Sequence, residues 1–147
     1  MFLATGLFIG AAPFAPGTFG SIIGLPIVFL LSRLNLLLSA SFILLFVFFA
    51  IAVASAAEKI LSQKDPSKIV IDEIAGLIVT FAGLSFNLRT AIAGFIIFRA
   101  FDILKPFPIR MLQDKLSGGS GVVLDDVLAG IYTNLILRLA FYITGVI

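Results

Sequence analysis

Five acidic residues in a strongly apolar chain are the side chains whose types and positions could do chemistry. They stand at the edges of apolar segments: Asp72, Glu73, Asp102, Asp125 and Asp126. An ionised carboxylate removed from water without a partner is very unfavourable, so such groups usually pair, take up a proton, line water or hold a cation. Only ten Lys and Arg residues are present to serve as partners. The pattern therefore favours a shared divalent cation such as Mg²⁺, with all five carboxylates as candidate metal ligands and catalytic groups.

Two of these acidic groups are adjacent pairs, D-E and D-D. Neighbouring side chains on a helix point about 100° apart, so we expect one member of each pair to bind metal. The other member would hold a second ion, a water or a basic neighbour. A simpler explanation is that acidic residues at a helix start interact favourably with the helix dipole. That explanation suffices for one pair, but it is weaker for three acidic groups together.

Several chemistries are excluded because the chain has no cysteine and no histidine. There can be no thiol nucleophile, Ser-His-Asp triad, phosphohistidine or imidazole metal ligand. Runs of Arg and Lys with interleaved aromatic residues are also missing, so nucleic acid is not an expected partner. The first ten residues lack a basic start and do not resemble a cleavable signal peptide.

The elements that must position the acidic residues are predicted to be membrane helices. Hydrophobic residues make up 61% of the chain and charged residues 12%, about half the charged share of a soluble protein. We predict an all-α integral membrane protein with one domain over 1–147. Five apolar segments are long enough to span a membrane or nearly so: 18–33, 36–60, 72–87, 88–104 and 122–145. Residues 105–116 begin with paired prolines and suit a helix at the membrane interface.

The loop charges predict an orientation. Basic residues cluster after the second and fourth segments (Lys59, Lys64, Lys68, Lys105, Arg110 and Lys115), whereas the opposite ends carry Arg33 and Arg89. Loops rich in Lys and Arg usually stay in the cytoplasm. All five acidic residues and the Pro/Gly-rich stretch 13–21 then lie at the cytoplasmic face.

Two acidic stretches resemble each other within the chain. I-V-I-D-E-I-A-G at 69–76 and V-V-L-D-D-V-L-A-G at 122–130 each place two carboxylates at a helix start, with a small residue one turn later. Small residues allow helices to approach closely in a membrane.

Four motifs, in order, carry a resemblance to a known family. They are P-F-A-P-G-T-F-G-S, D-P-S-K-I-V-I-D-E-I-A-G, F-R-A-F-D-I-L-K-P-F-P-I and G-G-S-G-V-V-L-D-D-V-L-A-G. Together they cover essentially the whole chain, which resembles the phosphatidylglycerophosphatase A family. The resemblance implies a bacterial inner-membrane lipid phosphatase that requires Mg²⁺. Such enzymes remove the terminal phosphate of phosphatidylglycerophosphate to give phosphatidylglycerol, the precursor of cardiolipin. The oligomeric state stays open.

With this resemblance, we expect the five carboxylates to hold one or two Mg²⁺ ions that neutralise the phosphate and acidify water. Arg99 and Lys105 would bind the phosphoryl group, and Thr18 and Ser21 would orient it. Arg99 lies three residues before Asp102 on a helix and could equally be its counter-ion. The nucleophile could be water or one of the aspartates.

Two other functions were weighed against a lipid phosphatase. A CDP-alcohol phosphotransferase-like enzyme would also use aspartates and a metal, but its D-G-x-x-A-R…G-x-x-x-D-x-x-x-D spacing is absent. A small ion or proton transporter would use carboxylates inside the membrane, near its middle and on both sides. The predicted gathering of the acidic residues at one face disfavours transport.

Overall fold

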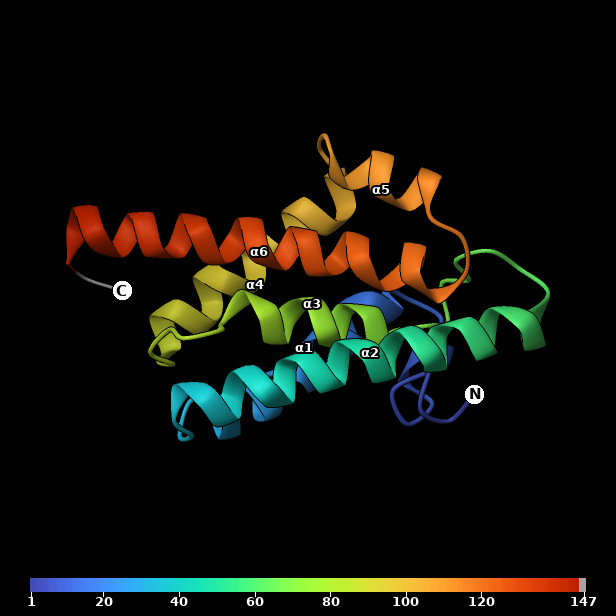
Figure 1. Cartoon of the computed structure of the whole chain (residues 1–147), viewed down its shortest axis with the longest axis horizontal. Coiled ribbons are helices and arrows are strands. Elements are labelled where there is room, and N and C mark those ends of the chain that lie inside the picture. The colour runs from blue at the N-terminus through green and yellow to red at the C-terminus, as the bar shows by residue number, and fades with distance from the viewer. Residues whose placement is uncertain (146–147) are drawn as a thin grey trace.

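The computed structural model describes residues 1–145 of the chain, and within them it is entirely helical (Figure 1). This confirms the all-α prediction. A short 3-10 helix (Ile9–Ala11) precedes six α-helices: α1 (Pro16–Leu31), α2 (Leu36–Leu61), α3 (Ile71–Thr80), α4 (Leu88–Leu104), α5 (Ile109–Lys115) and α6 (Gly119–Thr144).

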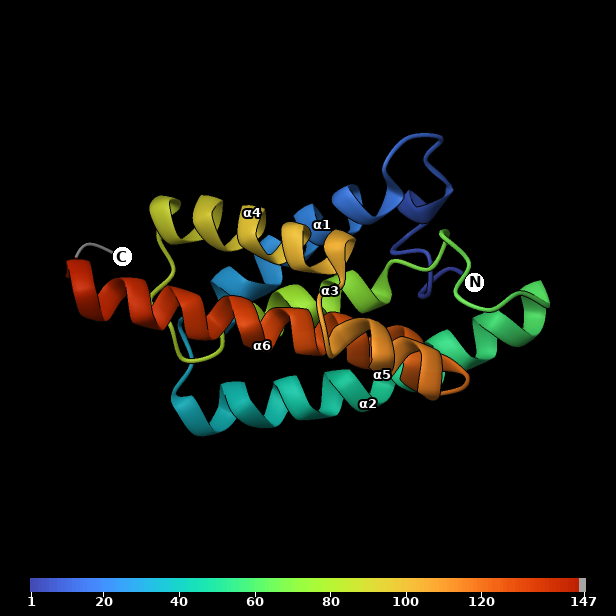
Figure 2. The ribbon, with the colours of Figure 1, turned by 90° about the horizontal axis from the view of Figure 1, so that it is seen from above.

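Five of the helices lie along the long axis of the molecule, and α5 packs across the first part of α6 (Figures 1 and 2). Helices α1, α3 and α6 run in one direction, while α2 and α4 run in the other (Figure 1). Among the described residues, α2 and α6 are long and apolar enough to cross a membrane, each with 26 residues. Because α1, α3 and α4 have 16, 10 and 17 residues, the five predicted spans stay a prediction.

Helix α2 presents its large apolar side chains outward. Leu37 is 77% exposed and Leu45 69%, whereas Ala50 and Ala54 on the inner side are fully buried. Exposure of so much apolar surface to water is unfavourable, whereas contact with hydrocarbon carries no such penalty. The inside-out distribution agrees with a helix that faces lipid.

Helix α3 ends seven residues earlier than the segment 72–87 predicts, and the segment continues as a turn through Gly83, whose φ is +65°. The end is stabilised by side chains of α6. Asn134 Nδ2 donates to the carbonyls of Thr80 and Ala82 at 2.8 and 3.0 Å, and Arg138 donates to Ala82 O at 2.8 Å. The last carbonyls of a helix need such partners, and these arrive from far along the chain.

Helix α6 begins at Gly119, earlier than the predicted start near 122, because its first turn packs directly on α2. A Cβ added to Gly119 would lie 2.3 Å from Ile51 O, and the Gly119 N–H donates to Ser55 Oγ at 3.0 Å. Residues 119–121 of the S-G-G-S-G sequence at 117–121 therefore form the first turn of the helix. The D-D pair lies about two turns inside α6 and does not open it, as the sequence predicts it would.

The two acidic stretches come together where α3 and α6 pack in parallel, which is the most extensive helix contact in the described chain. A Cβ on Gly130 would lie 2.3 Å from Gly76 O, and one on Gly76 would lie 2.6 Å from Asp126 O. The small residue that follows each acidic pair thus permits the contact, as expected.

The segment predicted as an interfacial helix over 105–116 is helical only over Ile109–Lys115. Lys105 ends α4 with a left-handed backbone conformation, and the two prolines that follow precede α5. Ile109 is fully buried and Arg110 is exposed, so α5 has one face toward the bundle and one charged face outward.

Candidate active site

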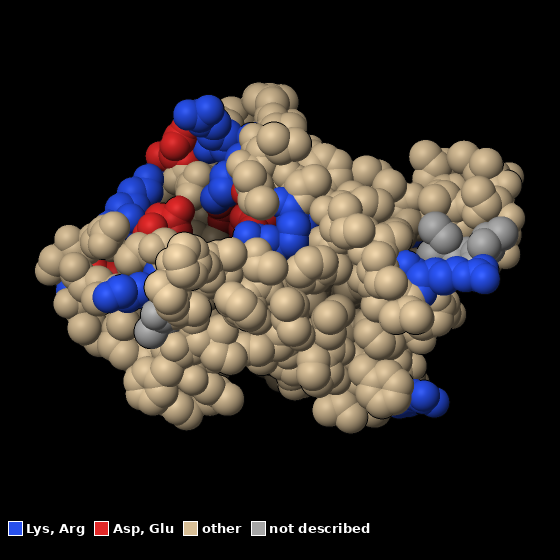
Figure 3. Space-filling model, turned by 180° about the vertical axis from the view of Figure 1, so that it is seen from behind, with Lys and Arg blue, Asp and Glu red and all other residues tan. Residues whose placement is uncertain are grey.

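The acidic residues gather at one end of the bundle, where α3 begins and α4 ends. Asp72 and Glu73 lie in the first turn of α3, and Asp102 lies in the last turn of α4. Asp125 and Asp126 reach the same end because α6 runs parallel to α3 (Figure 1). Seen from behind, acidic and basic side chains gather in a hollow at this end, while uncharged residues cover most of the remaining face (Figure 3).

Three of the carboxylates form a cluster in which each member has one buried oxygen without a hydrogen-bond partner. Asp72, Glu73 and Asp126 each supply an oxygen, and these oxygens all lie within 4.8 Å of one another. Asp72 and Asp126 are only 7% and 2% exposed. Asp72 Oδ1, Glu73 Oε2 and Asp126 Oδ2 are buried and accept no hydrogen bond. Like charges this close and this dry repel strongly, so the cluster fits a hard divalent cation that would neutralise them.

The adjacent pairs behave differently from each other. Asp72 and Glu73 were expected to face different partners, yet both reach the cluster. The longer Glu side chain compensates for the change of direction between neighbouring positions. In the D-D pair, Asp126 joins the cluster and Asp125 accepts a hydrogen bond from Lys105 Nζ, while metal binding by Asp126 stays a prediction.

The remaining two carboxylates are bound to cationic side chains. Asp125 is 1% exposed; its Oδ2 pairs with Lys105 and its Oδ1 accepts from the Asp126 N–H at 3.0 Å. Asp102 pairs with Arg99 one turn earlier in α4. A role for Asp102 and Asp125 as direct metal ligands stays a prediction. In the structure they pair with the side chains of Arg99 and Lys105 beside the cluster.

Arg99 has one of the two roles considered from the sequence, that of a counter-ion, and its binding of phosphate stays a prediction. Its Nη1 pairs with Asp102 and lies 3.8 Å from Glu73 Oε1, so it is a counter-ion to two carboxylates. Its Nε is buried and has no hydrogen-bond partner. A cationic side chain with an unpartnered N–H, placed beside a cluster that could hold a metal ion, is suited to bind a phosphate oxygen.

Lys105 stays charged in this environment. Partial burial disfavours its ammonium, but the hydrogen bond and charge of Asp125, with the further charges of Asp126 and Asp65, outweigh burial and raise the pKa of Lys105 above its ordinary value. The site therefore contains a permanent positive charge next to Asp125.

The start of α1 closes one side of the cluster. A Cβ added to Gly17 would lie 2.0 Å from Glu73 Oε1 and 3.1 Å from Arg99 Nη1, so any larger residue would displace the Glu73 carboxylate. Thr18 follows it and is partly exposed, and its predicted contact with substrate stays a prediction. Ser21 is fully buried, and its hydroxyl donates to Gly17 O at 2.9 Å. Ser21 thus supports Gly17, and its predicted contact with substrate stays untested.

Asp65, in the loop before α3, is not among the site residues predicted from the sequence. Its Oδ2 accepts from Gln113 Nε2 of α5 at 2.5 Å, and its N–H donates to Glu58 Oε1 at 2.8 Å. These bonds hold the loop near the acidic cluster, where the charge of Asp65 acts on Lys105. The D-P-S-K motif that leads into α3 contained this residue, but only its proximity to α5 reveals a role.

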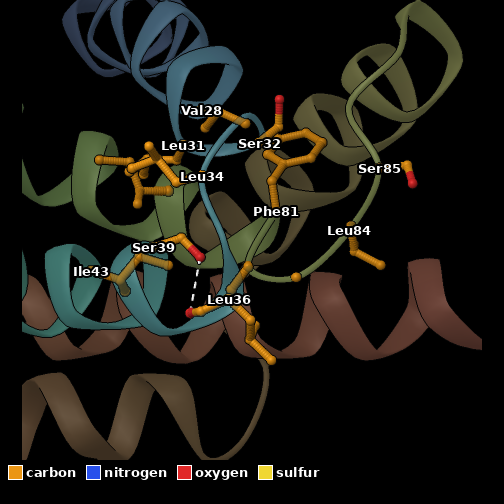
Figure 4. Close-up of a pocket in the computed structure, with 13 residues that line it drawn as sticks. Val28, Leu31, Ser32, Leu34, Leu36, Ser39, Ile43, Phe81, Leu84 and Ser85 are labelled. Carbon is orange, nitrogen blue, oxygen red and sulfur yellow. Dashed lines mark hydrogen bonds between the residues drawn. The ribbon is translucent and has the colours of Figure 1, made fainter.

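A cavity of about 360 Å³ lies at the end of the bundle opposite the acidic cluster. Leu31, Ile43 and Phe81 line it together with Ser32, Ser39 and Ser85, and the Ser39 hydroxyl donates to its own helix (Figure 4). No charged side chain of the described residues lines this cavity. It offers no groups for phosphate chemistry, so the acidic end is the candidate site.

Comparison with known proteins identifies the family of the chain. The family model described as phosphatidylglycerophosphatase A matches residues 2–141. Proteins named phosphatidylglycerophosphatase A from Escherichia coli and Haemophilus influenzae are 34% and 37% identical to the chain over 92% of its length, which covers 79% and 84% of theirs. A Bacteroides thetaiotaomicron protein named as a candidate phosphatidylinositol-3-phosphatase is 38% identical over 97% of the chain and 94% of its own length. No solved structure matches the chain significantly.

Proposed function

Because the chain belongs to the phosphatidylglycerophosphatase A family, we propose that its Asp72–Glu73–Asp126 cluster holds the Mg²⁺ with which it dephosphorylates its lipid. The chain is a phosphatase that hydrolyses phosphatidylglycerophosphate to phosphatidylglycerol and inorganic phosphate. The transporter alternative is not favoured by the family, and the carboxylates gather at one end of the bundle (Figure 3).

The three buried carboxylate oxygens without partners carry the metal proposal. All of them are hard oxygen donors, which suit Mg²⁺ better than a softer metal. When bound, Mg²⁺ supplies positive charge beside the phosphoryl oxygens and acidifies water.

The other side chains prepare the site for a phosphate dianion. Arg99 offers its free Nε–H to a phosphate oxygen while its Nη1 stays with Asp102. Lys105 adds a second positive charge, held in place by Asp125. Gly17 keeps the α1 backbone close to Glu73, and we expect the next residue, Thr18, to orient the phosphate. Positioned charges of this kind account for most catalysis of phosphoryl transfer.

Phosphate release from purified protein in detergent tests the function. We expect release from phosphatidylglycerophosphate with Mg²⁺, loss of release in excess EDTA, and recovery when Mg²⁺ is restored. Phosphatidylinositol 3-phosphate is the informative second lipid, because a relative is named for it and it shares the combination of a phosphodiester and a terminal monoester. Release that persists in EDTA would contradict the metal cluster, and release from the inositol lipid alone would change the assigned head group.

The proposed location is the bacterial inner membrane, with the site at the cytoplasmic face. Support comes from the distribution of basic residues: they are more numerous near the acidic end, for example Lys59, Lys105 and Arg110, than at the opposite end, where Arg33 lies. The positive-inside rule assigns the more basic end to the cytoplasm.

Cysteine labelling tests this orientation, because the chain contains no native cysteine. We expect an impermeant maleimide to label Arg33→Cys from the outside of intact spheroplasts, and Lys59→Cys only after the membrane is opened. Both positions are exposed, so lack of labelling reflects the membrane and not burial. The reverse pattern would place the site on the outer face.

A further inference from the structure

A pocket lined by basic side chains adjoins the acidic cluster at the corner between α4 and α5. It has a volume of about 490 Å³, and its lining comprises Lys105, Phe107, Arg110, Met111, Asp114 and Lys115. Three of these side chains are cationic and one is anionic, so the pocket is positively charged overall. The catalytic role proposed for the carboxylates uses only Lys105 from this set.

The cations of the outer part of this pocket are not neutralised. Within residues 1–145, neither Arg110 nor Lys115 has a carboxylate at ion-pair distance. Both side chains are exposed on the outward face of α5, which Ile109 anchors in the core. Exposed cations on an anchored helix are available to an anionic ligand.

Lys105 joins the pocket to the reaction centre. It lines the pocket, and its Nζ pairs with Asp125, the neighbour of Asp126 in the cluster. A ligand held by Arg110 and Lys115 therefore lies on the route to the cluster and shares Lys105 with it.

The outer edge of the same corner is apolar. Leu104 is 75% exposed, and Phe107, which also lines the pocket, is 80% exposed. A cationic pocket with an apolar edge matches a phospholipid at the point where its acyl chains meet its phosphate. Aromatic and apolar side chains at this depth favour the membrane interface.

We propose that the pocket formed by Lys105, Arg110 and Lys115 binds the phosphodiester of the lipid substrate while the terminal monoester enters the acidic cluster. This rests on the proposed function and deepens it. One glycerol unit separates the two phosphates of phosphatidylglycerophosphate, so a substrate of this type can occupy both places at once. The pocket would then select lipids with two phosphate groups and align the one that is hydrolysed.

Steady-state kinetics of the double variant Arg110→Gln/Lys115→Gln test the proposal. We expect KM for phosphatidylglycerophosphate to rise by about tenfold with kcat nearly unchanged, since charge-assisted contacts to the part of the lipid that does not react contribute to binding alone. Turnover of glycerol 3-phosphate, a monoester without a diester, should not change. The matched control is Lys59→Gln/Lys68→Gln, which removes the same charge from exposed positions at the same end of the bundle, outside the pocket.

The outcomes separate clearly. An unchanged KM, or the same rise in KM in the control variant, would overturn the proposal in favour of general attraction between cations and anionic lipid. A parallel loss of glycerol 3-phosphate turnover would overturn it too, because the cations would then serve the monoester or the fold.

Binding of short-chain phosphatidylglycerol, measured by calorimetry in detergent, tests the pocket independently of turnover. This lipid carries the diester and no monoester. We expect its affinity to fall at least about fivefold in the Arg110→Gln/Lys115→Gln variant, and equal affinities would overturn the proposal. If the wild-type chain released no phosphate from any lipid, the proposed function would be wrong. The binding measurement would still show whether the pocket binds a phosphodiester.

Discussion

Replacement of Asp126 by Asn is expected to abolish Mg²⁺-dependent phosphate release, with a loss of at least ~100-fold in kcat/KM. Asn keeps the shape of the side chain but removes one of the three charges that face one another with Asp72 and Glu73. The fold should survive, because removal of one buried like charge relieves repulsion. Thermal unfolding in detergent is therefore the second measurement. Mg²⁺ should raise the unfolding temperature of the wild-type chain and not that of the variant.

Asp125→Asn is the matched comparison, since it makes the same change at the next residue. Asp125 is bound to Lys105 and lies outside the three-oxygen cluster. We expect this variant to lose activity through a displaced Lys105, while Mg²⁺ still stabilises it. Wild-type activity in Asp126→Asn, or equal loss of Mg²⁺ stabilisation in both variants, would contradict the assignment of the cluster.

Gly130→Ala should destabilise the bundle by about 3 kcal/mol and remove most of the activity. The added methyl would lie 2.3 Å from Gly76 O, and backbone cannot move aside as a side chain can. Overpacking usually costs about 1–3 kcal/mol, and here the two helices must separate. Separation also moves Asp126 away from Asp72, and a shift of about 1 Å can reduce a rate roughly 100-fold. Unfolding monitored by circular dichroism and phosphate release measure the two effects.

The control for this effect is Gly24→Ala in α1. There the nearest atom to the new methyl is the end of the Leu77 side chain at 3.0 Å, which can adjust. The higher helix propensity of Ala compensates, so stability should change by less than about 1 kcal/mol. Similar losses in the two variants would mean that the α3–α6 contact is not the sensitive one.

The sequence predicted helices best where local patterns decide them. The segment 36–60 corresponds to α2 and 88–104 to α4, whose start is fixed by an Asn87–Thr90 capping box. Predictions failed where the deciding partner is distant. The end of α3 depends on Asn134 of α6, and the start of α6 depends on the fit of Gly119 against α2. Neither contact leaves a signal in the nearby sequence.

The candidate site followed the same rule. Residue type and position along the chain identified the acidic residues and their common end. Which of them lack a partner could not be predicted, because that depends on contacts such as Lys105 with Asp125, 20 residues apart. Three of the five carboxylates, Asp72, Glu73 and Asp126, come together in one cluster, and the charge of Asp65 acts on Lys105 although Asp65 lies in a loop.

The parallel packing of α3 and α6 has a consequence for how the protein is made. During synthesis α3 emerges with two carboxylates and only ten helical residues, while Asp126, Asn134 and Gly130 are still to be translated. Helix α4 must first return the chain so that α6 can lie alongside α3 in the same direction (Figure 1). A nascent chain that ends before α6 therefore lacks the helix on which α3 packs most extensively. The acidic cluster, which needs Asp126 beside Asp72 and Glu73, can form only after α6 has been made.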